Sequence, residues 1–347
     1  ADQRKCDRLR SAIQAPRIPI EARLVANGES RQNWGYCLDY LLVLGGLVGL
    51  YFGAEWLLRG AIALAQRLAI PTLIVSLVIV GFGTSMPELL VSARAALSGA
   101  SDIALGNVVG SNAANILLII GACALIFPIT HWDRGVKRDT YVMIGAAVLL
   151  LGLVQFDVIG RLAGLLMTAA LVAYVFYAYV QGKGSADSEL EQEVKHEVLG
   201  GALMGLLILG GLATLFAGAE LLVRGATSLA RDFGISEAVI GLTVVAVGTS
   251  LPELATGIMS AVRRHSDIMI GNIVGSNIFN ILFILGVTSL IQPIAVDPRF
   301  ASFDVPVMLA VTIGFSFLLL AHLGVRRLTA GAMIAAYVGY TVALVQV

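Results

Sequence analysis

The chain has 347 residues, of which 58% are hydrophobic and only 13% are charged. A soluble domain carries about 25% charged residues, so this composition excludes a disordered chain and argues strongly against a soluble enzyme. Lys and Arg number 23, as do Asp and Glu, so no basic excess points to a nucleic-acid partner. The chain is predicted to be a polytopic membrane protein.

Residues 1–38 differ from the rest, because they hold seven Lys and Arg residues and no apolar run. A signal peptide needs a hydrophobic segment, which this stretch lacks. We interpret it as a polar N-terminal extension, either flexible or an artefact of the assigned start, and do not count it as part of the fold.

From residue 39 onward, apolar stretches follow one another, each near the roughly 20 residues that cross a bilayer. The sequence predicts an all-α protein with one five-helix repeat at 39–181, an acidic loop at 182–198 and a second five-helix repeat at 199–347. The expected helices are 39–64, 70–97, 103–128, 138–155, 159–181, 199–229, 235–262, 268–292, 303–322 and 328–346.

The two halves are related in sequence by one common shift, the repeat offset, which carries Ala54 onto Ala219. Chance similarity of apolar segments does not explain this, because the matches include Glu, Pro, Asn, Ser and Thr. Five is an odd number, so the second half must enter the membrane in the opposite orientation. Inverted repeats of this kind build many secondary transporters, whose substrate site lies near the midplane between the repeats. The matching pairs are AEWLLRGAIALAQRLAI (54–70) with AELLVRGATSLARDFGI (219–235), GTSMPEL (83–89) with GTSLPEL (248–254), and SDIALGNVVGSNAANILLIIG (101–121) with SDIMIGNIVGSNIFNILFILG (266–286).

The placement of basic residues predicts the orientation. Beyond residue 38, eleven Lys and Arg residues lie in or next to loops after odd-numbered helices, and five lie after even-numbered helices. Cytoplasmic loops are enriched in Lys and Arg, so the odd loops, including the central one, are predicted to be cytoplasmic. Both termini are then outside, in a multi-pass protein of the cell (inner) membrane. The basic residues 1–38 point the other way, and we give the helical core more weight.

Two glutamates, Glu88 and Glu253, lie deep inside apolar segments at equivalent positions of the halves. A carboxylate without a partner at the bilayer centre costs at least ~2.5–3.5 kcal/mol. Neither segment offers a Lys or Arg within one helical turn of its glutamate. Two protonated glutamic acids, hydrogen-bonded in the core, are the structural alternative. The symmetric placement favours a cation that compensates both charges.

A proline precedes each glutamate, at Pro87 and Pro252. Proline cannot donate a backbone hydrogen bond and clashes with a carbonyl group of the preceding turn. Carbonyl groups freed at membrane depth are tolerated only beside a cavity or a ligand, so oxygens on these two helices are candidate cation ligands. The candidates are the backbone oxygens of Gly81, Thr84, Ala246 and Thr249, and the hydroxyl groups of Ser85 and Ser250.

The motifs GSNAAN and GSNIFN supply the other side of this site. Ser111 and Asn115, like Ser276 and Asn280, are spaced i and i+4 and so share one helix face. With the two carboxylates they form an all-oxygen set, which suits calcium, sodium or magnesium and disfavours zinc or copper.

Other readings of the chain are weaker. Glu55 with Arg59, and Glu220 with Arg224, have the spacing of neutralised helix pairs. An intramembrane hydrolase would need more than these acids and amides, and neither HExxH nor GxSxG occurs. We therefore predict no enzyme and no cofactor, with transported cations and the lipid bilayer as the only partners and no obligate protein partner.

The doubled motifs GTSMPEL with GNVVGSNAANILLIIG, and GTSLPEL with GNIVGSNIFNILFILG, resemble the paired alpha-repeats of the calcium/cation antiporter superfamily. The closest resemblance is to bacterial calcium/sodium antiporters of the sodium/calcium exchanger type, and it covers about residues 39–346. It implies ten transmembrane helices in two inverted halves, and an antiporter that exchanges Ca²⁺ for Na⁺ by alternating access at one midplane site. It also implies Ca²⁺ between Glu88, Glu253 and the backbone oxygens of Thr84 and Thr249, with Na⁺ at Gly81, Ser85, Ser111, Ala246, Ser250 and Ser276, and Asn115 and Asn280 lining the centre.

One position departs from part of this family. Some sodium/calcium exchangers carry Asp at the position of Asn280, whereas this chain has Asn both there and at Asn115, as the cation/proton branch does. Two carboxylates balance one Ca²⁺ or two Na⁺. The counter-ion therefore stays open between Na⁺, which we prefer, and H⁺ at the same two glutamates.

Overall fold

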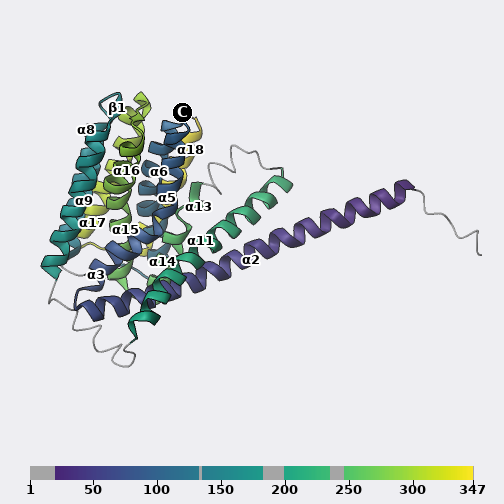
Figure 1. Cartoon of the computed structure of the whole chain (residues 1–347), viewed down its shortest axis with the longest axis horizontal. Helices are drawn as coiled ribbons and strands as arrows, with labels where there is room; N and C mark the ends of the chain where they lie inside the picture. Colours follow the sequence, from purple (N-terminus) through teal and green to yellow (C-terminus); the bar gives the residue numbers. More distant parts are fainter. Residues whose placement is uncertain (1–19, 133–134, 183–198, 235–245, 347) are drawn as a thin grey trace, which may run out of the picture.

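The computed structural model describes residues 20–132, 135–182, 199–234 and 246–346, and within these ranges the chain is almost entirely helical (Figure 1). Seven of the described helices are long and apolar enough to cross a membrane, and a helix pair bent by 43° makes an eighth span. The acidic loop expected at 182–198 lies almost wholly outside the described residues. So does the expected start of the seventh helix, at 235–245.

The first half follows the expected order of five spans, some of which are built from several short helices. Gly135–Leu153 is 19 residues long but carries Lys137, Arg138 and Asp139 near its N-terminal end, so it is less apolar than the other spans. The elements of this half are α2 (Ile20–Leu68), α3 (Thr72–Val75), η1 (Ser76–Val80), α4 (Gly81–Thr84), α5 (Met86–Leu97), α6 (Ser101–Ala114), η2 (Asn115–Ile120), α7 (Gly121–Ile126), α8 (Gly135–Leu153), β1 (Val158–Ile159) and α9 (Arg161–Gly182), where η marks a π-helical segment.

The second half repeats this order. Its elements are α11 (Gly201–Asp232), α13 (Ala246–Gly248), α14 (Leu251–Val262), α15 (Ser266–Phe279), η4 (Asn280–Leu285), α16 (Gly286–Ile291), β2 (Ile294–Ala295), η5 (Phe300–Asp304), α17 (Val305–Leu320) and α18 (Arg327–Gln346).

The first helix begins earlier than the sequence indicates. Helix α2 starts at Ile20 rather than near residue 39, so it runs through the second part of the segment interpreted as an extension. That part contains many strong helix formers, including Glu, Ala, Arg, Leu and Gln, and no proline occurs between Pro19 and Pro71. Helix propensity therefore carries the helix beyond the apolar stretch, which begins at Leu38.

Helices α2 and α11, the first of each half, lie side by side and run obliquely to the other helices (Figure 1). Glycines allow their backbones to touch. A Cβ atom on Gly218 would lie 2.7 Å from the backbone nitrogen of Leu50, and one on Gly53 would lie 2.7 Å from that of Leu215. Small residues permit such close crossing of membrane helices.

The third span of each half forms the centre of the molecule. Within its most apolar window, the span Ser266–Ile291 is 94% buried and the span Ser101–Ile126 is 72% buried, against 11% for Arg327–Leu344. The pair of central spans carries both copies of the GSN motif, so the polar side chains of these motifs lie where lipid cannot reach them.

Loops of one half pair with loops of the other. Strand β1 pairs antiparallel with β2, with Ile159 opposite Ile294. Ile129 exchanges backbone hydrogen bonds with Val325, at 3.0 and 2.8 Å. Ile129 and Ile294 are equivalent positions under the repeat offset, so the same loop of each half pairs with a loop of the other.

Candidate cation site

Both glutamates follow a break in the second helix of their half. Helix α4 ends at Thr84, and Ser85 has φ −83° and ψ 7° before α5 begins. Ser250 has nearly the same geometry, φ −90° and ψ 8°, before α14. The predicted single helix at 70–97 is therefore two bent segments, because the proline in the first turn of α5 supplies no N–H group.

The break places each glutamate in the first turn of a new helix, Glu88 in α5 and Glu253 in α14. Exposed N–H groups and the helix dipole favour a negative charge at this point. Each glutamate is only 1% exposed. Among the described residues, none of the ion pairs includes either carboxylate.

Each carboxylate is held by the helix break of the opposite half. Ser85 Oγ donates a hydrogen bond to Glu253 Oε1 at 3.1 Å, and Ser250 Oγ donates one to Glu88 Oε1 at 3.4 Å. In both glutamates Oε2 is buried and has no hydrogen-bond partner within the described part of the chain. The two carboxylates also lie within electrostatic range of each other. One shared cation would therefore compensate both negative charges and bind both oxygens that lack a partner.

The threonines and Gly81 extend this oxygen-rich region. Ser276 Oγ donates to the backbone oxygen of Gly81 at 3.4 Å, which joins two predicted ligands from different halves. Thr84 Oγ1 donates to Val80 O at 3.0 Å. Thr249 Oγ1 is buried and has no hydrogen-bond partner within the described residues.

The remaining predicted ligands are less well defined. Ser111 is 5% exposed on the central span. Ala246 is the first described residue of its segment and begins α13. The structure thus brings Glu88, Glu253, Ser85 and Ser250 together directly, and connects Gly81 with Ser276.

Asn115 and Asn280 each begin a π-helical segment, η2 and η4. Such segments occur as local bulges at functional sites, since they widen the helix and redirect side chains. Both asparagines are 1% exposed, and the Oδ1 atom of each is buried without a hydrogen-bond partner in the described ranges. Two amide oxygens are therefore available in addition to the free carboxylate oxygens.

Sequence reasoning missed four asparagines that surround these ligands. Asn107 Nδ2 donates to the backbone oxygen of Glu88 at 3.1 Å, and Asn272 Nδ2 donates to Thr256 Oγ1 at 2.9 Å. Asn112 and Asn277 contact the site asparagines. All four belong to the repeated segment GNxVGSN, and their recurrence at the repeat offset was the signal that could have identified them.

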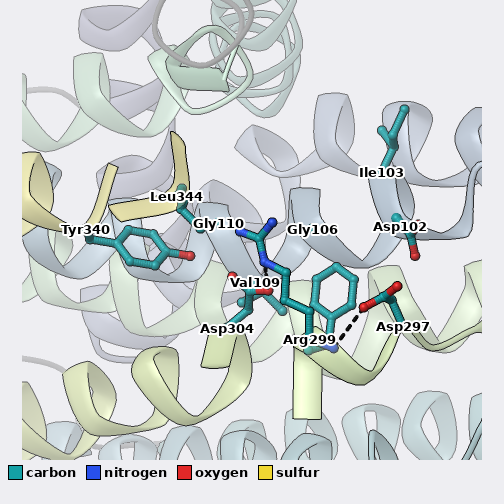
Figure 2. A pocket seen from close by; sticks show the side chains of 11 residues that line it. Asp102, Ile103, Gly106, Val109, Gly110, Asp297, Arg299, Asp304, Tyr340 and Leu344 are labelled. Atoms are coloured by element: carbon teal, nitrogen blue, oxygen red, sulfur yellow. Dashed lines mark hydrogen bonds and ion pairs between the residues drawn. The ribbon is translucent and has the colours of Figure 1, made fainter. Parts of the chain in front are cut away.

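A hollow of about 410 Å³ lies outside this site, between α6, the end of α18 and residues 297–304. Figure 2 shows Arg299 beside Asp304 and Asp297. Arg299 Nε lies 3.1 Å from Asp304 Oδ2, and the Arg299 backbone N–H donates a hydrogen bond to Asp297 Oδ1. None of the predicted ligands lines it. Across the described residues, no group of three or more His, Cys, Asp and Glu side chains could hold a metal ion, so a site centred on two carboxylates needs hydroxyl, amide and backbone oxygens as further ligands.

Comparison with known families identifies two matching segments. A model of the family described as "Sodium/calcium exchanger protein" matches residues 38–180 and 203–346, one segment in each half. The putative antiporter CaxA of Alkalimonas amylolytica is 38% identical over 310 residues, covering 86% of this chain and 96% of that protein. The sodium/calcium exchanger MaX1 of Methanosarcina acetivorans is 30% identical over 347 residues, covering 88% of this chain and 98% of its own.

A solved structure supports the same fold. The sodium-calcium exchanger NCX_Mj, soaked with zero Na⁺ and Ca²⁺, superposes with a TM-score of 0.76 at 27% identity, covering 89% of this chain and 99% of that one. Together with the two family matches, this likeness confirms the predicted all-α membrane fold of ten helices in two inverted five-helix halves.

Proposed function

Because the chain belongs to the sodium/calcium exchanger protein family, we propose that it is a secondary active antiporter that exchanges Ca²⁺ for Na⁺ at a site centred on Glu88 and Glu253. It is a membrane transporter and not an enzyme. Alternating access exposes this one midplane site first to one side of the membrane and then to the other, as one group of helices slides past the other.

One observation carries the proposal. Two buried carboxylates face each other's half of the chain, each has an oxygen without a partner, and no basic side chain of the described residues forms an ion pair with them. An unpaired charge is costly in this environment. A transported cation compensates that cost only while it is bound, so the site favours states in which one ion or another occupies it.

Charge balance limits how the ions share the site. Two carboxylates neutralise one Ca²⁺ or two Na⁺, so any third Na⁺ depends on neutral oxygens. The amide oxygens of Asn115 and Asn280 and the hydroxyl group of Thr249 are buried and free of partners in the described chain. They are the groups that would hold a third ion.

Energetics favour a third ion. Exporting Ca²⁺ against a ~10⁴-fold gradient costs about 5.5 kcal/mol, and moving two charges against ~100 mV adds about 4.6 kcal/mol. Each Na⁺ entering down an approximately tenfold gradient and the same potential supplies about 3.7 kcal/mol. Two ions therefore supply roughly 7 kcal/mol and three supply roughly 11 kcal/mol, so three are needed under these conditions.

Flux measurements in liposomes test the counter-ion. With the full chain in Na⁺-loaded vesicles, dilution into Na⁺-free buffer is expected to drive uptake of radioactive calcium. A protonophore should leave this uptake unchanged. Calcium uptake at the same rate with and without the Na⁺ gradient would contradict sodium coupling.

Proton coupling is the second candidate, because Asn occupies both central positions and the chain has no third carboxylate there. In that case an outward H⁺ gradient, with Na⁺ absent, would drive calcium uptake, and a protonophore would abolish it. The same two glutamates would then alternate between Ca²⁺ and protons.

We also propose an orientation. The excess of Lys and Arg after odd-numbered helices places the loop 182–198 in the cytoplasm and both termini outside, in the inner membrane of a bacterial cell. A single cysteine introduced in this loop, after replacement of Cys6, Cys37 and Cys123 by alanine, should react with an impermeant maleimide only after the cells are opened. Labelling of this cysteine in intact cells would contradict this orientation and indicate the opposite one.

A further inference from the structure

Two asparagines outside the proposed ligand set contact the site asparagines from the opposite half. Asn280 Nδ2 donates to Asn112 Oδ1 at 3.1 Å, and Asn115 Nδ2 donates to Asn277 Oδ1 at 3.0 Å. Asn112 and Asn277 are each 1% exposed. The two contacts are equivalent under the repeat offset, so each half supplies an acceptor for the amide group of the other.

The direction of these hydrogen bonds is set by groups that can only accept. Asn112 Nδ2 donates to Met308 Sδ at 3.6 Å, and Asn277 Nδ2 donates to Met143 Sδ at 3.8 Å. A thioether sulfur has no proton to donate, so it fixes the amide nitrogen of each asparagine on its own side. Asn277 Nδ2 also lies 3.5 Å from the backbone oxygen of Asn112, another pure acceptor.

The fixed orientation of these two amide groups in turn fixes the orientation of the site asparagines. Because their amide nitrogens face sulfur, Asn112 and Asn277 present their amide oxygens to the site asparagines. Asn280 and Asn115 can therefore bond to them only as donors, through their own NH₂ groups. The Oδ1 atoms of the two site asparagines then remain free, and both are buried without a partner in the described residues. An amide flipped by half a turn has nearly the same shape but would present its NH₂ group instead.

We propose that Asn112 and Asn277 are positioning residues that hold the amide oxygens of Asn280 and Asn115 toward the transported cation. The proposal rests on the proposed function, because it assigns a cation to the side of these amides that carries the free oxygens. Without the orienting acceptor, an NH₂ group faces the cation for part of the time, and the affinity falls. Met308 and Met143 act one step further away, by fixing the positioning residues themselves.

The variant Asn112→Leu tests this, because leucine retains much of the volume but removes the acceptor. Calcium binding is measured as the calcium-dependent rise in the melting temperature of the purified full chain. The dissociation constant for Ca²⁺ should rise about tenfold, the loss expected for one ligand oxygen that is no longer held in place. Thr312→Val, which removes a buried hydroxyl group one turn from Met308, is the control and should leave the constant unchanged.

A second background separates orientation from simple packing. In Asn280→Asp the side chain presents an oxygen whichever way it turns, so it needs no orienting acceptor. Adding Asn112→Leu to this background should therefore raise its dissociation constant less than about twofold, against about tenfold in the wild type. Equal losses in both backgrounds would overturn the proposal and leave Asn112 as a packing residue.

The same data distinguish the two levels of inference. If the melting temperature of the wild-type protein does not change with Ca²⁺, this result contradicts the proposed function. Wild-type protein that responds to Ca²⁺, together with an Asn112→Leu variant of equal affinity, would overturn only the positioning role.

Discussion

The hydroxyl group of Ser85 donates a hydrogen bond to the carboxylate of Glu253, 168 residues away in the sequence and in the other half of the chain. The equivalent pair joins Ser250 to Glu88. Each half therefore orients the charged group of the other, and neither site glutamate is positioned by its own half alone.

Replacing Ser85 by alanine should weaken this arrangement without removing a charge. A hydrogen bond to a charged group contributes about 1.5–3 kcal/mol, so the apparent KM for the transported ions should rise by at least about tenfold. Calcium flux into proteoliposomes as a function of ion concentration measures this. Ser289→Ala removes a fully buried hydroxyl group whose hydrogen bonds, within the described residues, go to Leu285 and Gly286 of its own span, and it should leave KM unchanged.

Replacing Glu253 by glutamine should affect exchange far more. Glutamine keeps the shape of the side chain but removes the negative charge and offers one oxygen and one NH₂ group. The exchange rate should fall at least about 100-fold, the consequence of losing about 2.7 kcal/mol of cation stabilisation. Glu88→Gln should behave alike because of the repeat. Calcium exchange at the normal rate in Glu253→Gln would show that the site is wrongly assigned.

The contact between α2 and α11 should not tolerate a methyl group at Gly218. A Cβ atom there would lie 2.7 Å from Leu50 N and 2.9 Å from Gly46 O, so Gly218→Ala should destabilise the chain by about 1–3 kcal/mol. Gly210 lies on the same helix, where a Cβ atom would meet nothing within 4 Å. Gly210→Ala should instead be neutral or stabilising by up to about 1 kcal/mol. Thermal unfolding in detergent compares the two, and equal losses would argue against the close packing.

An ion-pair cluster around Glu55 on α2 has no counterpart around Glu220 among the described residues. Glu55 accepts hydrogen bonds from Arg59 and from Arg263, which follows the end of α14. Its counterpart Glu220 pairs with Arg224 and is 58% exposed, against 7% for Glu55. The position equivalent to Arg263 is Ser98, so the link from the first helix to the seventh cannot form in the other half.

Removal of this link should therefore cost more stability than removal of the exposed pair between Glu220 and Arg224. Since the Arg263 side chain is 45% exposed, solvent screens the pair, and Arg263→Gln should reduce the free energy of unfolding by about 0.5–1 kcal/mol. Arg224→Gln, in the exposed pair, should change it by less than about 0.5 kcal/mol. Melting curves of both variants at low and high salt test the difference, and identical melting temperatures would rule out a special role for Arg263.

The chemistry of the site could be read from local signals in the sequence. Glu88 and Glu253 are conspicuous because a charge inside an apolar span is expensive, and the prolines beside them predict a helix break, which occurs at Ser85 and Ser250. The pairs Glu55–Arg59 and Glu220–Arg224 also form as their spacing predicts.

The partners across the two halves could not be read in this way. The sequence indicated Ser85 as a candidate ligand on the helix of Glu88, but its hydrogen bond to Glu253 in the other half is seen only in the structure. The roles of Asn112 and Asn277 depend on how the central spans cross, and Arg263 reaches Glu55 only through tertiary packing. Such contacts depend on packing angles that no single span encodes.

The exchanged backbone pairs, β1 with β2 and Ile129 with Val325, bear on how such a chain could have arisen. In a single half, the backbone N–H and C=O groups of these loops would lack their hydrogen-bond partners. Two copies inserted in opposite orientations would supply these partners to each other through the same bonds. The chain thus has the geometry of an antiparallel homodimer whose two subunits have been joined into one polypeptide.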